Sequence, residues 1–135
     1  MEQNHPPMGG VVALEKATLY NRYFRREMWT GEHLQITVMS IPIGGEVGKE
    51  VHEDLDQVLV VERGSASVFM SREEGDLPFV GEAAEGYAIL VPAGTYHNIL
   101  NDGRVPLQMF SIYAPPKHPI GTLHRTKEEA DQAEN

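Results

Sequence analysis

The sequence predicts an all-β domain, a sandwich or barrel of short strands, and three observations support this prediction. Stretches rich in Val, Ile, Leu and aromatic residues recur along the chain, separated by turn residues roughly every 8–12 residues. No segment has the long helical pattern that connects parallel strands. With 135 residues and 41% hydrophobic content, the chain is long enough for one domain with its own core.

The first third of the chain is expected to form a tail and then strands. Residues 1–10 are rich in Pro, Gly and polar groups and are expected to be a flexible tail before a domain spanning residues 11–125. We expect Val11–Leu19 to be a strand or an irregular segment, and Arg22–Trp29 to be an edge strand. Leu34–Ile41 alternates with the period of a strand and is expected to form one.

The rest of the chain adds further strands, ended mostly by turn residues. They are predicted at Gln57–Arg63, Ser65–Met70, Phe79–Ala83, Ala88–Val91, from His97 onward and at Pro106–Ala114. Near the C-terminal end, Thr126 is followed three residues later by Glu129, which is the pattern of a capping box. Residues 126–135 are therefore expected to form a short surface helix and tail.

The overall charge argues against a nucleic-acid partner. The formal net charge is −9, whereas phosphates require a basic face. No stretch approaches ~20 apolar residues, so no membrane span is predicted. The first residues lack the basic start and apolar run of a signal peptide, which makes a cytoplasmic location the default expectation. Because the chain has no cysteine, disulfides and thiolate metal sites are excluded.

Two polar segments share a spacing that is stronger evidence than either segment alone. They are Gly44-x5-Glu50-x-His52-x4-Gln57-x6-Gly64 and Gly86-x5-Pro92-x-Gly94-x2-His97-x3-Asn101. Together they resemble the two motifs of the cupin superfamily, G-x5-H-x-H-x3,4-E-x6-G and G-x5-P-x-G-x2-H-x3-N. The second segment matches at each fixed position. In the first, Glu50 stands where the family usually has His, and Gln57 stands where it usually has Glu.

The resemblance implies a cupin barrel, also called a double-stranded β-helix or jelly roll, with a short C-terminal helix added. The stretches around Gly44–Gln57 and Tyr113–Thr122 look like small one-domain bacterial cupins. Such proteins are often labelled as similar to mannose-6-phosphate isomerase, a label that follows from the shared barrel rather than from activity. The resemblance also implies a homodimer, for which Val11–Trp29 offers an apolar, aromatic edge.

The residue types at these positions support a metal site independently. Glu50 and His52 are two apart on an extended segment, so they share one face. A tight hairpin can bring Gln57 beside them, and the turn at Pro92–Gly94 can present His97. Such donors suit one divalent ion, namely Mn, Fe, Co, Ni, Cu or Zn. Three strong ligands leave positions open for water or substrate, and Gln57 is either a weak fourth ligand or a group that orients bound water.

Two enzyme chemistries suit such a site. One is isomerisation of a small polar molecule such as a sugar or sugar phosphate, with Glu50, or Asp54 if it faces inward, as the base. The other is iron-dependent dioxygenase chemistry on the triad of Glu50, His52 and His97. A non-catalytic cupin that binds a small ligand or a metal is the alternative to both.

A few further residues are candidates with weaker sequence support. Arg63 shares strand parity with Gln57, so it is expected to line the interior and is the candidate for binding a substrate phosphate. Tyr113 is expected mainly to pack and is a lesser candidate for substrate contact. His118 and His124 lie in the proline-rich exit and are expected at the surface, with a place at the barrel mouth as the alternative.

Overall fold

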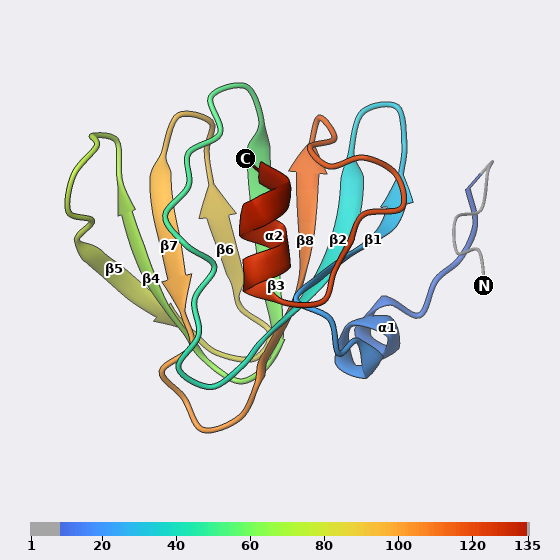
Figure 1. The fold of residues 1–135 in the computed structure, drawn as a ribbon, viewed down its shortest axis with the longest axis horizontal. Helices are drawn as coiled ribbons and strands as arrows, with labels where there is room; N and C mark the ends of the chain where they lie inside the picture. Colours follow the sequence, from blue (N-terminus) through green and yellow to red (C-terminus); the bar gives the residue numbers. More distant parts are fainter. Residues whose placement is uncertain (1–8, 135) are drawn as a thin grey trace.

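The computed structural model describes residues 9–134, which fold into two antiparallel sheets (Figure 1). The strands are β1 (Arg25–Thr30), β2 (Gln35–Ile41), β3 (Asp56–Arg63), β4 (Ala66–Ser71), β5 (Phe79–Ala83), β6 (Ala88–Val91), β7 (Tyr96–Leu100), β8 (Leu107–Ala114) and β9 (Leu123–His124). One sheet has the order β6-β3-β8-β2-β1-β9 and the other has the order β5-β4-β7. The predicted all-β class is confirmed, and β5 and β6 have the predicted bounds.

Hydrophobic side chains from both sheets meet between them and form the core. Alternate residues of β2, β3 and β8 point into this interior, and their character changes along each strand. At one end, which we call the apolar end, they are Met39, Ile41, Val61, Leu107 and Met109. At the other end, which we call the polar end, they are Gln35, Thr37, Gln57, Ser111 and Tyr113. The same strands therefore build a core and a polar site.

The segment before β1 is helical, and the prediction of a strand or irregular segment there is wrong. Helix α1 spans Leu14–Tyr20, and its more buried residues follow a helical spacing in which Thr18 is fully buried. The Gln108 side chain of β8 donates to the carbonyls of Leu19 and Asn21, which ties the end of α1 to the sheet. Contacts with the sheet, rather than strand propensity, decide this segment. Residues 1–8, most of the predicted tail, lie outside the described residues.

The C-terminal helix was predicted correctly, and a short strand before it was not predicted. Helix α2 spans Lys127–Glu134, and the Thr126 hydroxyl accepts a hydrogen bond from the Glu129 amide at 3.1 Å, as a capping residue does. Ala130 is 3% exposed and anchors the helix to the core. Strand β9 pairs with Arg25 and Arg26, so β1 is an edge strand only beyond these two residues. Within residues 9–134, neither helix is long and apolar enough to cross a membrane.

Candidate metal centre

The segment that carries Glu50 and His52 is held beside β7 by backbone hydrogen bonds. Glu50 and His97 form an antiparallel bridge in which each amide donates to the other residue's carbonyl at 2.9 Å. The Gly94 amide donates to the carbonyl of His52 at 2.8 Å. Residues directly opposite each other in such a pair project their side chains to the same face. Two segments far apart in the sequence are thereby joined at the point where their ligand-type side chains emerge.

Two other residues of the second motif hold this arrangement in place. Gly94 has a φ of +79°, a left-handed conformation that glycine adopts without a Cβ penalty. Asn101 is fully buried, and its side chain donates to the carbonyls of Ile41 and Val105 and accepts from the Gly103 amide. The last residue of the motif therefore ties the end of β7 to the turn after β2 and the loop before β8. Its role is to position the strand that carries a ligand.

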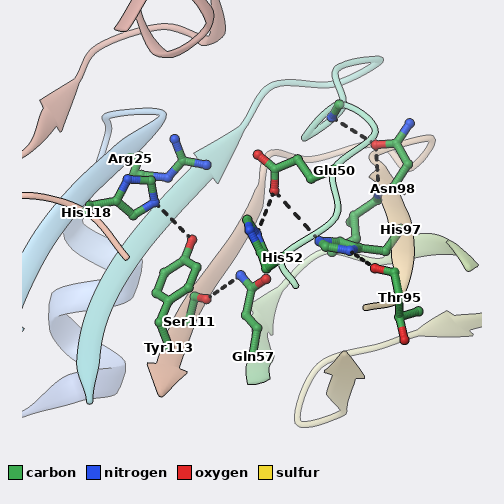
Figure 2. Close-up of polar contacts among 12 residues, drawn as sticks. Arg25, Glu50, His52, Gln57, Thr95, His97, Asn98, Ser111, Tyr113 and His118 are labelled. Carbon is green, nitrogen blue, oxygen red and sulfur yellow. Dashed lines mark hydrogen bonds and ion pairs between the residues drawn. The ribbon is translucent and has the colours of Figure 1, made fainter. Parts of the chain in front are cut away.

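Three ligand-type side chains converge at the polar end (Figure 2). The ligand atoms of Glu50, His52 and His97 all lie within 4.8 Å of one another. Glu50 Oε1 is 3.4 Å from His52 Nε2 and 3.7 Å from His97 Nε2. The exposed fraction of the side chain falls from 26% for Glu50 to 10% for His52 and 2% for His97. The cluster is therefore reached by solvent from the Glu50 side.

The tautomer of His97 is fixed by the backbone. Its Nδ1 lies 3.0 Å from the carbonyl oxygen of Thr95, which can only accept, so Nδ1 carries the proton and Nε2 presents its lone pair toward Glu50. Burial lowers the pKa of His97, although the Thr95 carbonyl and the Glu50 carboxylate oppose the shift. The ring is therefore neutral at neutral pH. A neutral imidazole whose other nitrogen is held by a hydrogen bond is the usual form of a histidine metal ligand.

Gln57 lies beside the cluster with one end of its amide fixed. Its Nε2 donates to Ser111 Oγ at 2.8 Å, whereas the buried Oε1 has no hydrogen-bond partner. Figure 2 shows this oxygen on the side of His52. The buried Nε2 of His52 lies 3.4 Å from Glu50 Oε1. A buried oxygen without a partner is costly to leave unsatisfied, and a divalent ion would satisfy it, so these donors fit the predicted metal.

Glu50 is the charged member of the cluster. Burial by itself raises the pKa of its carboxyl group, but the neighbouring His52 and the positive charge of Arg25 lower it. The net effect is a pKa below the usual value for glutamate, so the carboxylate is ionised at neutral pH. A metal ligand must be in this form, because the proton and the metal compete for the same oxygen.

A second group of polar side chains faces the cluster from the six-stranded sheet and the loop after β8. The ring centroid of Tyr113 is 6.2 Å from that of His52 and 5.2 Å from that of His118. The Tyr113 hydroxyl lies 3.4 Å from His118 Nε2, and Figure 2 shows Arg25 of β1 beside this histidine. Burial raises the pKa of Tyr113. Burial also lowers the pKa of His118, and with the positive charges of Arg25 and Lys117 the value falls to about 3. Both side chains are therefore uncharged at neutral pH.

Two residues singled out in the sequence lie outside this site. Asp54 is exposed in a bend that ends the extended course of the chain after His52, so it does not face inward. Arg63 is exposed at the end of β3, where a bulge between Val61 and Arg63 breaks the alternation that starts at Gln57. The prediction that Arg63 lines the interior is wrong, whereas Gln57 does point inward.

Arg25 was not predicted as a residue of the site, and His118 does not lie where it was predicted. His118 is 9% exposed and lies at the polar end, so the expectation of a surface residue is wrong for it, while His124 is half-buried. A signal for Arg25 was present in the pair Arg25-Arg26. Successive residues of a strand point to opposite faces, so one of two adjacent arginines in β1 had to point inward. Tyr113 lines the interior, as a candidate for substrate contact must.

Comparison with known proteins gives relatives over most of the chain. No family model matches the sequence. The chain is 44% identical over 133 residues to YrkC, an uncharacterised protein of Bacillus subtilis (strain 168), covering 98% of this chain and 72% of YrkC. The crystal structure of BH2720 from Bacillus halodurans matches with a TM-score of 0.91 and 51% identity, covering 93% of this chain and 96% of that one.

A more distant solved structure shows the likeness of the fold. It is a cupin superfamily protein, DSY2733 from Desulfitobacterium hafniense DCB-2, which matches with a TM-score of 0.61 and 19% identity. The match covers 84% of this chain and 97% of that one. At this level of identity the likeness concerns the fold alone, and it agrees with the double-stranded β-helix expected from the two motifs.

Proposed function

We propose that this chain is a cupin that binds one divalent metal ion and acts on a small polar molecule at the polar end. The ion would be held by Glu50, His52 and His97. The observation that carries the proposal is the convergence of these ligand atoms within 4.8 Å, with the lone pair of His97 Nε2 fixed toward the others. One carboxylate and two imidazoles leave positions for a substrate beside the ion.

Each residue of the site has a separate task in this proposal. A bound divalent ion would supply Lewis-acid polarisation of a substrate oxygen. Gln57, held by Ser111, would direct its free amide oxygen toward the ion or toward water between them. The phenol of Tyr113 stays protonated and can donate, while neutral His118 beside it can accept, so this pair is suited to moving a proton at the substrate.

Isomerase-like proton transfer is the reaction class that these residues support best. Asp54 is exposed, which leaves Glu50 and the pair of Tyr113 and His118 as the proton-transfer groups at the site. The mannose-6-phosphate isomerase-like assignment stays a prediction, and exposed Arg63 gives a sugar phosphate no support. An iron-dependent dioxygenase is the second candidate, because two histidines and one carboxylate are the ligands of non-haem iron oxygenases. A binding protein without catalysis is the third.

Metal content of freshly purified protein tests the proposal. We expect close to one divalent ion per chain in the wild type, and a loss of most of it in His97→Ala. His33→Ala is the matched control, because His33 is 87% exposed and lies outside the cluster. Retention of the metal by His97→Ala would place the ion elsewhere. Iron, with oxygen consumption in the presence of a substrate, would favour the dioxygenase, whereas manganese or zinc would leave the isomerase and the binding protein as candidates.

The homodimer expected from the sequence stays a prediction. Val11 and Tyr20 flank α1 and are almost completely exposed, which is unusual for apolar residues. A pocket of about 370 Å³ lies close by and is lined in part by Met28, Trp29 and Ile36. A second copy would cover these residues. Light scattering of the full chain at micromolar concentration should give the mass of a dimer, and a monomer mass would contradict the prediction.

A further inference from the structure

Arg25 is a buried cation that the metal site does not use. It is 2% exposed and is the only buried arginine or lysine among the described residues. Its neighbour Arg26 is half-buried on the opposite face of β1. Burying a guanidinium group costs free energy unless its charge and its N–H groups are matched. The fold therefore buries a guanidinium group at the polar end at a cost in free energy. Only interactions of that group can offset this cost.

The contacts of Arg25 leave part of the guanidinium group unmatched. Its Nη1 lies 3.3 Å from His124 Nδ1, and its Cζ lies 5.4 Å from the centroid of the Phe24 ring. Its Nε is buried and has no hydrogen-bond partner. Among the described residues no carboxylate forms a direct ion pair with Arg25. Glu50 is the carboxylate whose charge it stabilises, and Figure 2 shows the guanidinium group turned toward that side.

The balance of charge at the polar end favours an anion. Glu27 is the single carboxylate of β1; it is buried, and its oxygens accept from the Thr30 hydroxyl and the Gly121 amide. With a divalent ion in place, Arg25 and the ion together outweigh Glu27 and Glu50. Neutral His118 adds no charge. An anionic group between the ion and Arg25 would bring this end of the interior close to neutrality.

We propose that Arg25 binds a carboxylate group of the ligand, and that the ligand is a small organic acid whose other polar end lies at the cluster of Glu50, His52 and His97. The second part rests on the proposed function. One planar guanidinium fork matches the two oxygens of a carboxylate. A phosphate group carries more oxygens and more charge, and the polar end offers no second buried arginine or lysine for it among the described residues. Thr37 Oγ1, which is buried without a partner, can donate a further hydrogen bond to the same ligand.

Titration with two matched probes tests this inference. Malonate and its half-amide malonamate keep one carboxylate for the metal and differ only at the second end. By isothermal titration, the metal-loaded full-length wild type should bind malonate about tenfold more tightly than malonamate, because a hydrogen bond between charged groups is stronger than a neutral one. Inorganic phosphate should bind more weakly than malonate. Equal binding of malonate and malonamate by the wild type would overturn the proposal.

Three variants assign the preference to a residue. Arg25→Met should reduce the ratio of the two affinities to within twofold, and Arg25→Lys should give an intermediate ratio, because lysine keeps the charge and loses the fork. Arg63→Met removes the same charge from an exposed position and should keep the wild-type ratio. Loss of the preference in Arg63→Met, or its survival in Arg25→Met, would overturn the assignment to Arg25.

Two further measurements keep the test decisive. If Arg25→Met fails to fold, the buried Nε–H of Arg25 can be followed by NMR in the wild type. Its resonance should shift with malonate and not with malonamate, and no shift would contradict the proposal. In metal-free protein both probes should bind more weakly while malonate remains preferred. A chain that takes up no metal but keeps this Arg25-dependent preference would refute the proposed metal site and leave the carboxylate site standing.

Discussion

The apolar end and the polar end of the interior are built from the same strands. They differ in whether their buried side chains carry polar atoms that lack hydrogen-bond partners. At the apolar end, Ile41 of β2 lies opposite Leu107 of β8, and both are fully buried among hydrophobic neighbours. At the polar end of the same two strands, Thr37 lies opposite Ser111, and both are equally buried. The backbone pairing is continuous, so the difference between the ends lies in the side chains alone.

Side chains at the polar end lower the stability of the folded state, whereas those at the apolar end raise it. Buried atoms without hydrogen-bond partners gather at the polar end, among them Arg25 Nε, Thr37 Oγ1 and Gln57 Oε1. Each such atom lowers the stability of the folded state. The hydrophobic core and the polar site are therefore separated along the length of the strands, and both lie between the two sheets. Substitutions at the two ends should therefore affect different measured quantities.

The largest effect is expected at the apolar end. Leu107→Ala removes a fully buried side chain from the core and should lower the free energy of unfolding by about 3 kcal/mol. Urea unfolding of the metal-free protein measures this loss. The further stability that added metal gives should be the same in the variant as in the wild type. Loss of that metal-dependent increase in stability would show that the two ends are coupled. It would contradict the expectation that substitutions at the two ends affect different quantities.

The next effect belongs to the polar end and depends on metal. At a hundredfold excess of metal over its dissociation constant, binding to the folded state adds about 2.7 kcal/mol. For a domain of this size, that raises the melting temperature on the order of 10 °C. EDTA should abolish this rise in the wild type. His97→Ala should show no rise with metal, whereas Gln57→Ala should keep part of it because three ligands remain.

Acid should destabilise the protein through His118. Its pKa is about 3 in the folded protein, against an ordinary value of 6.5 for histidine, so below pH 6.5 the unfolded chain binds a proton that the folded chain does not. The stability contribution is complete above pH 6.5 and is lost as the pH falls toward 3. At pH 5 the loss due to this residue is about 2 kcal/mol. Arg25, Lys117, His124 and Glu50 are the charged or titratable groups that influence it.

Comparing variants isolates this contribution of His118 from that of other titrating groups. His118→Gln should lose about 2 kcal/mol less stability than the wild type between pH 7 and pH 5, measured by urea unfolding of metal-free protein. His33→Gln, at an exposed position, should follow the wild-type curve. An identical pH dependence in wild type and His118→Gln would show that His118 is not held neutral by its surroundings.

The smallest predicted effect has the opposite sign. Thr37 is fully buried and its hydroxyl has no hydrogen-bond partner, so Thr37→Val should stabilise the metal-free protein by about 1 kcal/mol. Thr18→Val is the matched control, because that buried hydroxyl donates to the Leu14 carbonyl at 2.8 Å and its loss should not stabilise. Thermal unfolding of both variants compares them. A destabilised Thr37→Val would mean that the polar end is better satisfied than its geometry indicates.

The local pattern of the sequence predicted most of the strands and the candidate metal ligands. Glu50, His52, Gln57 and His97 were predicted from their spacing, since period-two alternation and turn-forming glycines act over a few residues and are visible in one segment. The capping box at Thr126 belongs to the same class, and its hydrogen bond is present. Features that depend on neighbouring residues in the chain were therefore accessible before the fold was known.

Only the tertiary structure decided which other side chains share the interior with these ligands. The bulge that turns Arg63 outward arises from the pairing of β3 with β8, and the burial of His118 arises from the return of the chain after β8 across the polar end. Arg25 reaches the same place because β1 joins the sheet beyond β2, far in sequence from either motif. A local pattern can indicate that one of Arg25 and Arg26 points inward, but it cannot show which side chains it meets there. That depends on strand order and register, which the pairing of distant segments sets.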